Sequence, residues 1–293
     1  MQFRDCAAAV MGLPKSERRL KRCRIRLNHL FPASHREGVI IFVLQPIVQP
    51  ASSLQLSGRL YGLGVGPGDP ELLTLKALRI LQAAPIVAYP VLDNGKSLAR
   101  SIVAEYLSAD QIEIPMYFPF KPDQSAQPFY DKAAETLAEH LSAAQDVAVL
   151  CEGDPFFYGT FMYLFTRLSE RFTTEVVPGV SSIMASASVM GAPLTYRNDA
   201  FMVLPGILPA EVLAERLKVA DAAVIIKIGR HFSKVQEVLN QLGLAARALY
   251  IERATMQNQR IVPLKEIESD TVPYFSLILI PSQWEQISNS SVD

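Results

Sequence analysis

Short apolar runs alternate with amphipathic helical patterns from residue 58 to residue 280, and this alternation restricts the chain to the α/β class. Apolar runs of this length fit strands buried on both faces, and the patterns between them have the helical period. Strands are predicted at 59–65, 85–91, 112–118, 146–155, 174–182, 199–206, 221–229, 247–255, 259–267 (as a sheet edge) and 274–280. The ranges 146–155 and 174–182 include the turn that ends the strand. Helices are predicted at 69–84, 97–107, 128–144, 158–170, 183–192, 209–220 and 232–243.

The pattern changes character near Pro178, where helices become richer in small residues. A chain of 293 residues is long enough for two domains of ordinary size. We therefore predict two α/β domains, residues 58–177 and residues 178–293, with a ligand cleft between them.

Residues 1–57 differ from the rest in charge, with nine Lys/Arg against three Asp/Glu, a net of +6. Because the whole chain carries −1, residues 58–293 carry −7. We interpret residues 1–57 as an N-terminal extension that is dispensable for folding, since the strand pattern starting at Arg59 is self-sufficient. The alternative is a targeting arm or an arm that contacts nucleic acid.

The composition narrows the classes of function. A net charge of −1 disfavours a nucleic-acid binder that relies on a positive field, and no apolar run reaches the roughly 18 residues of a membrane span. The three cysteines lack CxxC spacing and the four histidines are scattered, so neither a metal site nor a disulfide framework is predicted. A reducing cytoplasm is therefore the expected location.

The loop "YGLGVGPGDP" at residues 61–70 packs four glycines between a strand and a helix. A dinucleotide fingerprint would need G-x-G-x-x-G and an acidic residue at the end of the next strand. In each register the third glycine is replaced, by Pro67, Asp69 or Glu71, and the next strand ends at Tyr89. A dinucleotide is thereby disfavoured, and so is the usual Rossmann-type methyltransferase. Two interpretations stay open: close backbone approach to a neutral or cationic ligand, or a tight connection without a ligand.

Three further stretches place polar groups at strand ends, where α/β sheets bind ligands. "CEGDPFFYGT" puts Glu152 and Asp154 after a buried strand, although Asp154 is also a good helix cap before proline. "VVPGVSS" opens a helix at Ser181 and Ser182, whose free N–H groups bind a carboxylate or are capped. Lys227 ends an apolar strand, so it either reaches the cleft or extends to solvent.

The stretches "GxGPGD…LLTLKA", "GDPFFYGT", "VVPGVSS" and "GAPLT" occur in this order, and together they resemble the tetrapyrrole methylase family. "LYGLGVGPGDPELLTLKALRIL", "CEGDPFFYGTFMYLF" and "KIGRHFSKV" look most like the branch that methylates C20 of precorrin-2 in cobalamin synthesis. The resemblance implies S-adenosylmethionine as cofactor, a metal-free or cobalt-bound tetrapyrrole as substrate, and a homodimer. Residues 1–57 have no counterpart in the family pattern.

Carried over residue by residue, the resemblance places the cofactor in the cleft between the two domains. The residues implied around it are Pro67, Glu152, Gly153, Asp154, Phe157, Ser181, Ser182, Lys227 and Ala254.

The resemblance also sets the chemistry that the residues must serve. Methyl transfer to C20 leaves a hydrogen on that carbon, so a base or an ordered water must remove it. Asp154 is the first candidate base, whereas Lys227 and Tyr274 fit better as positioning residues. The substrate's carboxylates are expected to pair with two members of a basic set: Arg197, Arg230, His231, Arg253 and Arg260.

Three alternatives stay open from the sequence. A corrinoid or sirohaem methylase acting at a different ring carbon would share these motifs. A regulatory module would bind the cofactor without transferring its methyl group. A dehydrogenase is third, and the missing fingerprint already weakens it.

Overall fold

The structure is a computed structural model that describes residues 57–91, 95–118 and 125–283. Residues 55–293 form one compact unit. All of the predicted extension 1–57 except Ser57 lies outside the described residues, so our interpretation of it stays a prediction.

The first half of the described chain builds a sheet of five parallel strands in the order β3-β2-β4-β1-β5. Parallel strands need a crossover after each strand, and the helical patterns of the sequence supply these crossovers. The strands are β1 (Leu60–Gly64), β2 (Ile86–Val91), β3 (Ile112–Tyr117), β4 (Val147–Cys151) and β5 (Thr174–Val177).

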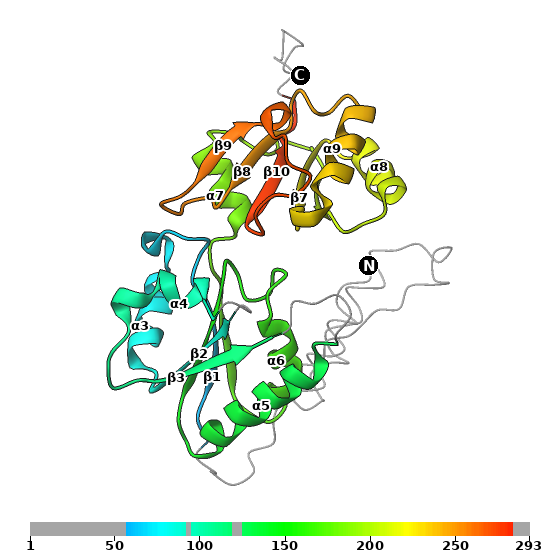
Figure 1. Ribbon diagram of the computed structural model, residues 1–293. Helices are drawn as coiled ribbons and strands as arrows, with labels where there is room; N and C mark the ends of the chain where they lie inside the picture. The colour runs from blue at the N-terminus through cyan, green and yellow to red at the C-terminus, as the bar shows by residue number, and fades with distance from the viewer. Residues whose placement is uncertain (1–56, 92–94, 119–124, 284–293) are drawn as a thin grey trace, which may run out of the picture. The chain divides into compact units, whose positions relative to one another are not determined.

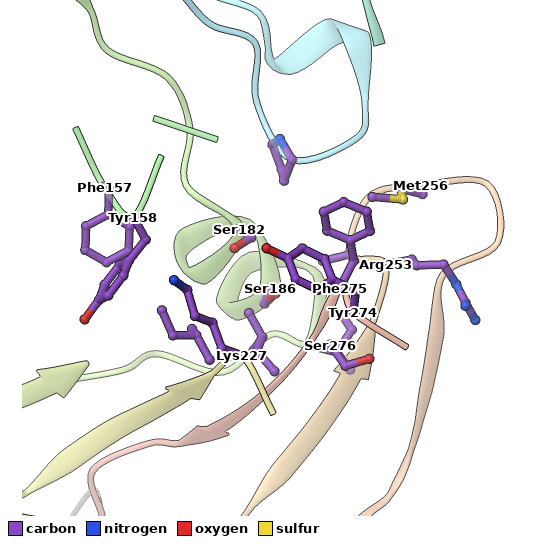
Figure 2. Close-up of a pocket in the computed structure, with 15 residues that line it drawn as sticks. Phe157, Tyr158, Ser182, Ser186, Lys227, Arg253, Met256, Tyr274, Phe275 and Ser276 are labelled. Carbon is purple, nitrogen blue, oxygen red and sulfur yellow. The ribbon is translucent and has the colours of Figure 1, made fainter. Parts of the chain in front are cut away.

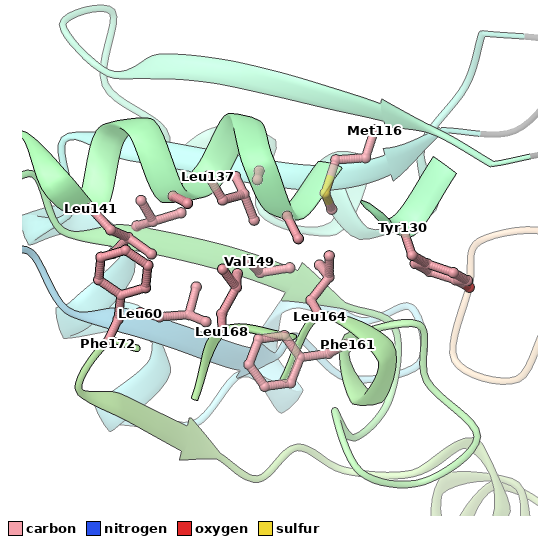
Figure 3. Packing of buried hydrophobic residues seen from close by; sticks show 14 of the residues in the cluster. Leu60, Met116, Tyr130, Leu137, Leu141, Val149, Phe161, Leu164, Leu168 and Phe172 are labelled. Carbon is pink, nitrogen blue, oxygen red and sulfur yellow. The ribbon is translucent and has the colours of Figure 1, made fainter. Parts of the chain in front are cut away.

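Helices cover both faces of this sheet (Figure 1), and the central strand β4 is accordingly apolar and buried at every position. Along β4, Val147 and Val149 face one cluster, whereas Ala148 and Leu150 face the other. Figure 3 shows the first cluster, where Leu137 and Leu164 pack over Val149. The helices are α5 (Gln127–Ser142) and α6 (Phe161–Leu168) on that face, and α3 (Leu75–Ala83) and α4 (Leu98–Ile102) on the opposite face.

The second half builds a mixed sheet in the order β6-β7-β10-β8-β9, with β9 at the edge as predicted. Only β6 and β7 pair in parallel. The strands are β6 (Phe201–Pro205), β7 (Ala222–Ile226), β8 (Leu249–Glu252), β9 (Arg260–Pro263) and β10 (Ser276–Ile280). Helices α8 (Ala210–Lys218) and α9 (Phe232–Gln241) cover one face, and α7 (Ser182–Val189) covers the other. The α/β class with two sheets is confirmed, and the domain division at residue 178 stays a prediction.

Three glycine turns meet at the carboxyl edge of the first sheet, beyond the neighbouring strands β4, β1 and β5. Gly66 and Gly153 form a backbone bridge, in which Gly153 N–H donates to Gly66 C=O at 2.8 Å. A Cβ placed on Gly64 would lie 2.5 Å from Gly179 N and 2.7 Å from Gly153 O. Backbone therefore packs directly on backbone here, which only residues without a side chain allow.

The predicted helix 69–84 is in fact two elements. Asp69 caps only the 3-10 helix η2 (Pro70–Leu72), and the chain is extended again at Leu73. The α-helix α3 begins after a second cap, in which Thr74 Oγ1 accepts from Ala77 N–H at 3.1 Å. Within α3, Leu75 is 87% exposed, whereas Ala77, Ile80 and Leu81 are buried.

Two other helix predictions need correction. The helix expected at 158–170 begins only at Phe161, because Tyr158 takes a left-handed φ of 56°. Asp154 therefore caps a turn, accepting from Phe156 N–H at 2.9 Å, and not a helix. The helix expected at 97–107 breaks at Val103 into α4 and the 3-10 helix η3 (Ala104–Tyr106).

Replacing Gly64 with alanine tests the glycine contact. We expect Gly64→Ala to lower the free energy of unfolding by about 2–3 kcal/mol, because the new Cβ meets backbone atoms that cannot rotate away. Urea titration measures the change. Gly229→Ala is the matched control, since its Cβ meets only Val272 O at 3.8 Å. Equal stability of the two variants would contradict the proposed contact.

Candidate functional site

One pocket of the described residues gathers side chains from both halves of the chain (Figure 2). Its volume is about 160 Å³, which suits one ring system and not a whole tetrapyrrole. Its floor comes from β7, β8 and β10, and aromatic rings stand on its walls. The lining residues are Pro67, Phe157, Tyr158, Ser182, Ser186, Ile226, Lys227, Ile251, Arg253, Ala254, Met256, Tyr274, Phe275, Ser276 and Leu277.

The backbone of the pocket is strained at several positions. Tyr158 and Lys227 both have φ of 56°, and Arg253 has φ of 50°. Each left-handed non-glycine residue costs about 1–2 kcal/mol, and such residues persist where the surroundings hold them for function. Two of these residues contact each other: Lys227 Nζ lies 5.1 Å from the centre of the Tyr158 ring, in a cation–π contact.

A buried carboxylate braces the loop that follows β8. Glu252 is 3% exposed, and it accepts from the hydroxyl of Tyr250 at 2.9 Å and from Arg260 at 3.2 Å. It also accepts from Arg253, whose Nε donates to Asn258 C=O at 3.0 Å. Burial raises the pKa of Tyr250, and the Glu252 hydrogen bond raises it further, so its proton stays in place.

The same loop contacts the first glycine turn. Asp69 N–H donates to Thr255 Oγ1 at 3.1 Å, and a Cβ on Gly68 would lie 2.6 Å from Met256 Cγ. The absence of a side chain at Gly68 thus lets the turn carrying Pro67 approach the loop after β8 closely.

The two predicted acidic residues, Glu152 and Asp154, do not line the pocket. Asp154 accepts from Phe156 N–H with one oxygen and from Gly179 N–H, at 3.0 Å, with the other. Glu152 accepts from Ala99 N–H at 3.2 Å, and burial raises the pKa of this carboxyl. Both contacts tie neighbouring loops together.

The structure brings most of the predicted site together. Pro67, Phe157, Ser182, Lys227, Ala254 and Tyr274 line the pocket. Glu152, Gly153, Asp154 and Ser181 adjoin it without lining it; Ser181 instead caps α7, accepting from Met184 N–H at 3.4 Å. Their predicted roles stay predictions.

The predicted basic set is only partly gathered. Arg253 lines the pocket, but its guanidinium points away from Lys227 (Figure 2) and pairs with Glu252. Arg197, Arg230, His231 and Arg260 do not line it. Sequence reasoning missed Ser186, Met256 and the floor residues, because a serine or isoleucine inside an apolar pattern carries no signal of its own.

Two further features of the described residues concern metal binding and membranes. No group of three or more His, Cys, Asp or Glu side chains gathers there in a way that could hold a metal ion. In the same ranges, no helix has the length and apolar content needed to cross a bilayer.

Comparison with known families decides what this pocket belongs to. Residues 59–268 match the profile of the Tetrapyrrole (Corrin/Porphyrin) Methylases, and this range includes strands β1 to β9. The chain belongs to the tetrapyrrole methylase family. The resemblance seen in its motifs is thereby confirmed.

Relatives within the family carry more specific names. Precorrin-2 C(20)-methyltransferase of a Sinorhizobium species is 42% identical over 76% of this chain and 95% of its own length. Cobalt-precorrin-2 C(20)-methyltransferase of Salmonella typhimurium is 33% identical over 78% of this chain and 99% of its length. Cobalamin biosynthesis protein CobIJ of Mycobacterium tuberculosis is also 42% identical, but the match covers 46% of that protein. The chain thus spans about half the length of this last relative.

Solved structures of tetrapyrrole methylases share the fold. A uroporphyrin-III C-methyl transferase from Thermus thermophilus, solved with S-adenosylhomocysteine, aligns with a TM-score of 0.57 and 30% identity over 76% of this chain and 97% of its own. A cobalt precorrin-4 methyltransferase aligns with a TM-score of 0.59 over 79% and 98% of the two chains. At 21% identity, the latter supports the fold alone.

Stability measurements at several pH values test the burial of Glu152. Its pKa is raised in the folded protein, so the native state holds this proton more tightly than the unfolded chain does. The contribution is fully present below about pH 4.5 and is lost as the pH rises through the folded pKa. We expect Glu152→Gln to raise the melting temperature at pH 8 and to leave it nearly unchanged at pH 4.

The exposed Glu105→Gln on η3 is the control, with no expected difference at either pH. A Glu152→Gln effect that is independent of pH would contradict the burial of a charged carboxylate.

Proposed function

We propose that this chain transfers a methyl group from S-adenosylmethionine to C20 of precorrin-2, a step of cobalamin biosynthesis. The observation that carries the proposal is the 42% identity to a precorrin-2 C(20)-methyltransferase along 95% of that relative, together with a pocket built by the matching motifs. The relative named for the cobalt-bound substrate is 33% identical, so cobalt-precorrin-2 is the second candidate acceptor.

The pocket fits the proposed cofactor chemically. Its floor of Ile226, Ile251 and Leu277 suits a flat, weakly polar ring. Ser186 lines the pocket, and its buried hydroxyl has no hydrogen-bond partner among the described residues. No acidic side chain lines the described pocket, so a positively charged sulfur would face its aromatic rings.

The bound cofactor would supply an electrophilic methyl group, and the residues of the chain would position it. Pro67 and the glycine turns fix one wall, and Phe157, Tyr158, Tyr274 and Phe275 supply aromatic faces. Holding the methyl group and the acceptor carbon roughly 3–3.5 Å apart and in line is the main contribution that a protein makes to such a displacement.

Lys227 is the group we propose for the substrate's carboxylates. It is exposed at the pocket, its charge is held over the Tyr158 ring, and its strained backbone aims it there. Tyr274 also lines the pocket; desolvation and the negative charge of Glu152 raise its pKa, which keeps the hydroxyl protonated as a hydrogen-bond donor.

Asp154 was predicted to remove the hydrogen from C20. Its two oxygens accept backbone N–H groups of Phe156 and Gly179, and this arrangement favours a positioning role. We therefore propose an ordered water as the proton acceptor, with Asp154 holding the turn. Glu152, Gly153 and Ser181 support the cofactor wall from behind in this proposal. A homodimer and a cytoplasmic location stay predictions.

A methyl-transfer assay tests the function directly. Purified protein with S-adenosylmethionine labelled on its methyl group should label precorrin-2 and release one S-adenosylhomocysteine per methyl group transferred. NMR of the product should place the label at C20. The cobalt-bound substrate in a parallel reaction measures the preference between the two acceptors.

The outcomes separate the alternatives. A label at another ring carbon would assign a different methylase of the family. Cofactor binding without transfer to either tetrapyrrole would indicate a regulatory module. Tight binding of NAD(P) with no affinity for S-adenosylmethionine would overturn the proposal.

Replacing Lys227 tests its proposed role with the substrate. We expect Lys227→Met to raise KM for the tetrapyrrole about tenfold or more, because a charge-assisted hydrogen bond is worth roughly 1.5–3 kcal/mol. The affinity for S-adenosylhomocysteine should change little, and Lys227→Arg should recover most of the loss.

Lys218→Met makes the same change of charge at an exposed position in the last turn of α8, and it should match the wild type. A lower kcat with an unchanged KM in Lys227→Met would contradict the positioning role and indicate a base.

A further inference from the structure

Ser186 is the one described lining residue whose polar atom is buried without a partner. Its side chain is 0% exposed on α7, one turn after Ser182, and both side chains reach the pocket (Figure 2). Buried hydroxyls in native proteins are nearly always hydrogen-bonded, and an unpaired one costs roughly 1–3 kcal/mol. An unpaired buried hydroxyl in the lining of a pocket therefore indicates that a ligand supplies its hydrogen-bond partner.

The same helix shows how a serine is ordinarily satisfied. Ser188 Oγ donates to Met184 C=O, four residues earlier, at 3.0 Å. Helical serines commonly make this bond. Ser186 does not make it, and its hydroxyl has no other partner among the described residues, although Ser186 belongs to the pocket lining.

The surroundings of Ser186 restrict the ligand group that it contacts. The floor is apolar, formed by Ile226, Ile251 and Leu277. Of the two cationic lining residues, Lys227 is exposed and Arg253 pairs with Glu252. A carboxylate or an ammonium group buried on this floor would have no described counter-charge, which makes its desolvation costly.

We propose that Ser186 Oγ is a ligand-contacting group that hydrogen-bonds the purine ring of the proposed cofactor on the pocket floor. This inference rests on the proposed function, since it takes the nucleoside of S-adenosylmethionine as the occupant. A purine satisfies each constraint: it is flat, uncharged and weakly polar, and it carries ring nitrogens that accept a hydrogen bond from a hydroxyl.

Ser186→Ala distinguishes a hydroxyl that binds the ligand from one that stabilises the fold, because the two predict changes of opposite sign in the melting temperature of the free protein. Removing an unpaired buried hydroxyl should raise the melting temperature of the free protein by about 2–4 °C. The same variant should bind S-adenosylhomocysteine about five- to tenfold more weakly by calorimetry. Ser188→Ala is the matched control on the same helix and should leave the affinity unchanged.

A second ligand tests which part of S-adenosylhomocysteine Ser186 contacts. 5′-Methylthioadenosine contains the purine but lacks the amino-acid end, so Ser186→Ala should weaken both ligands by the same factor. Weakening of S-adenosylhomocysteine alone would overturn the purine assignment. Unchanged affinity for both ligands would overturn the ligand contact while leaving the proposed function standing. If the wild type binds neither ligand, the proposed function itself fails.

Discussion

Backbone-on-backbone packing of Gly64, Gly153 and Gly179 is the constraint on which the site depends. Because β4, β1 and β5 are neighbours in a parallel sheet, their three carboxyl ends emerge side by side. Side chains there would force the turns apart, whereas glycines let Gly153 bond Gly66 and let Asp154 bond the Gly179 N–H. The glycine loop at 61–70 thus packs against the turns at Gly153 and Gly179, and this packing fixes the positions of Pro67 and Phe157.

The other side of the pocket depends on a buried ionic cluster. Glu252 accepts from Tyr250, Arg253 and Arg260, and the bond from Arg253 offsets part of the cost of its left-handed conformation. Removing one partner of such a cluster leaves an uncompensated charge, which is far more costly than the strain. The loop carrying Ala254 and Met256 is therefore held in place before a ligand arrives.

Sequence patterns were sufficient for what depends on local periodicity. Every predicted strand exists, β9 lies at an edge, and the family assignment is confirmed. Predictions failed where a second cap or a backbone turn interrupts the helical pattern. Thr74 competes with Asp69 as a cap, and Tyr158 turns left-handed before α6. Ser186 could not be singled out, because its burial and its missing partner exist only in the folded chain.

The distribution of charge explains how such a pocket would treat a sulfonium donor. Glu152, Asp154 and Glu252 all lie close by, yet each carboxylate is satisfied by backbone N–H groups or side chains and none lines the described pocket. Positive charge on the donor disperses as its methyl group leaves, so a lining carboxylate would stabilise the ground state more than the transition state. Aromatic rings would bind the cation more weakly than a carboxylate does and would oppose its reaction less. By this reasoning, acidic residues that hold the turns and stay out of the pocket lining would suit the proposed methyl transfer.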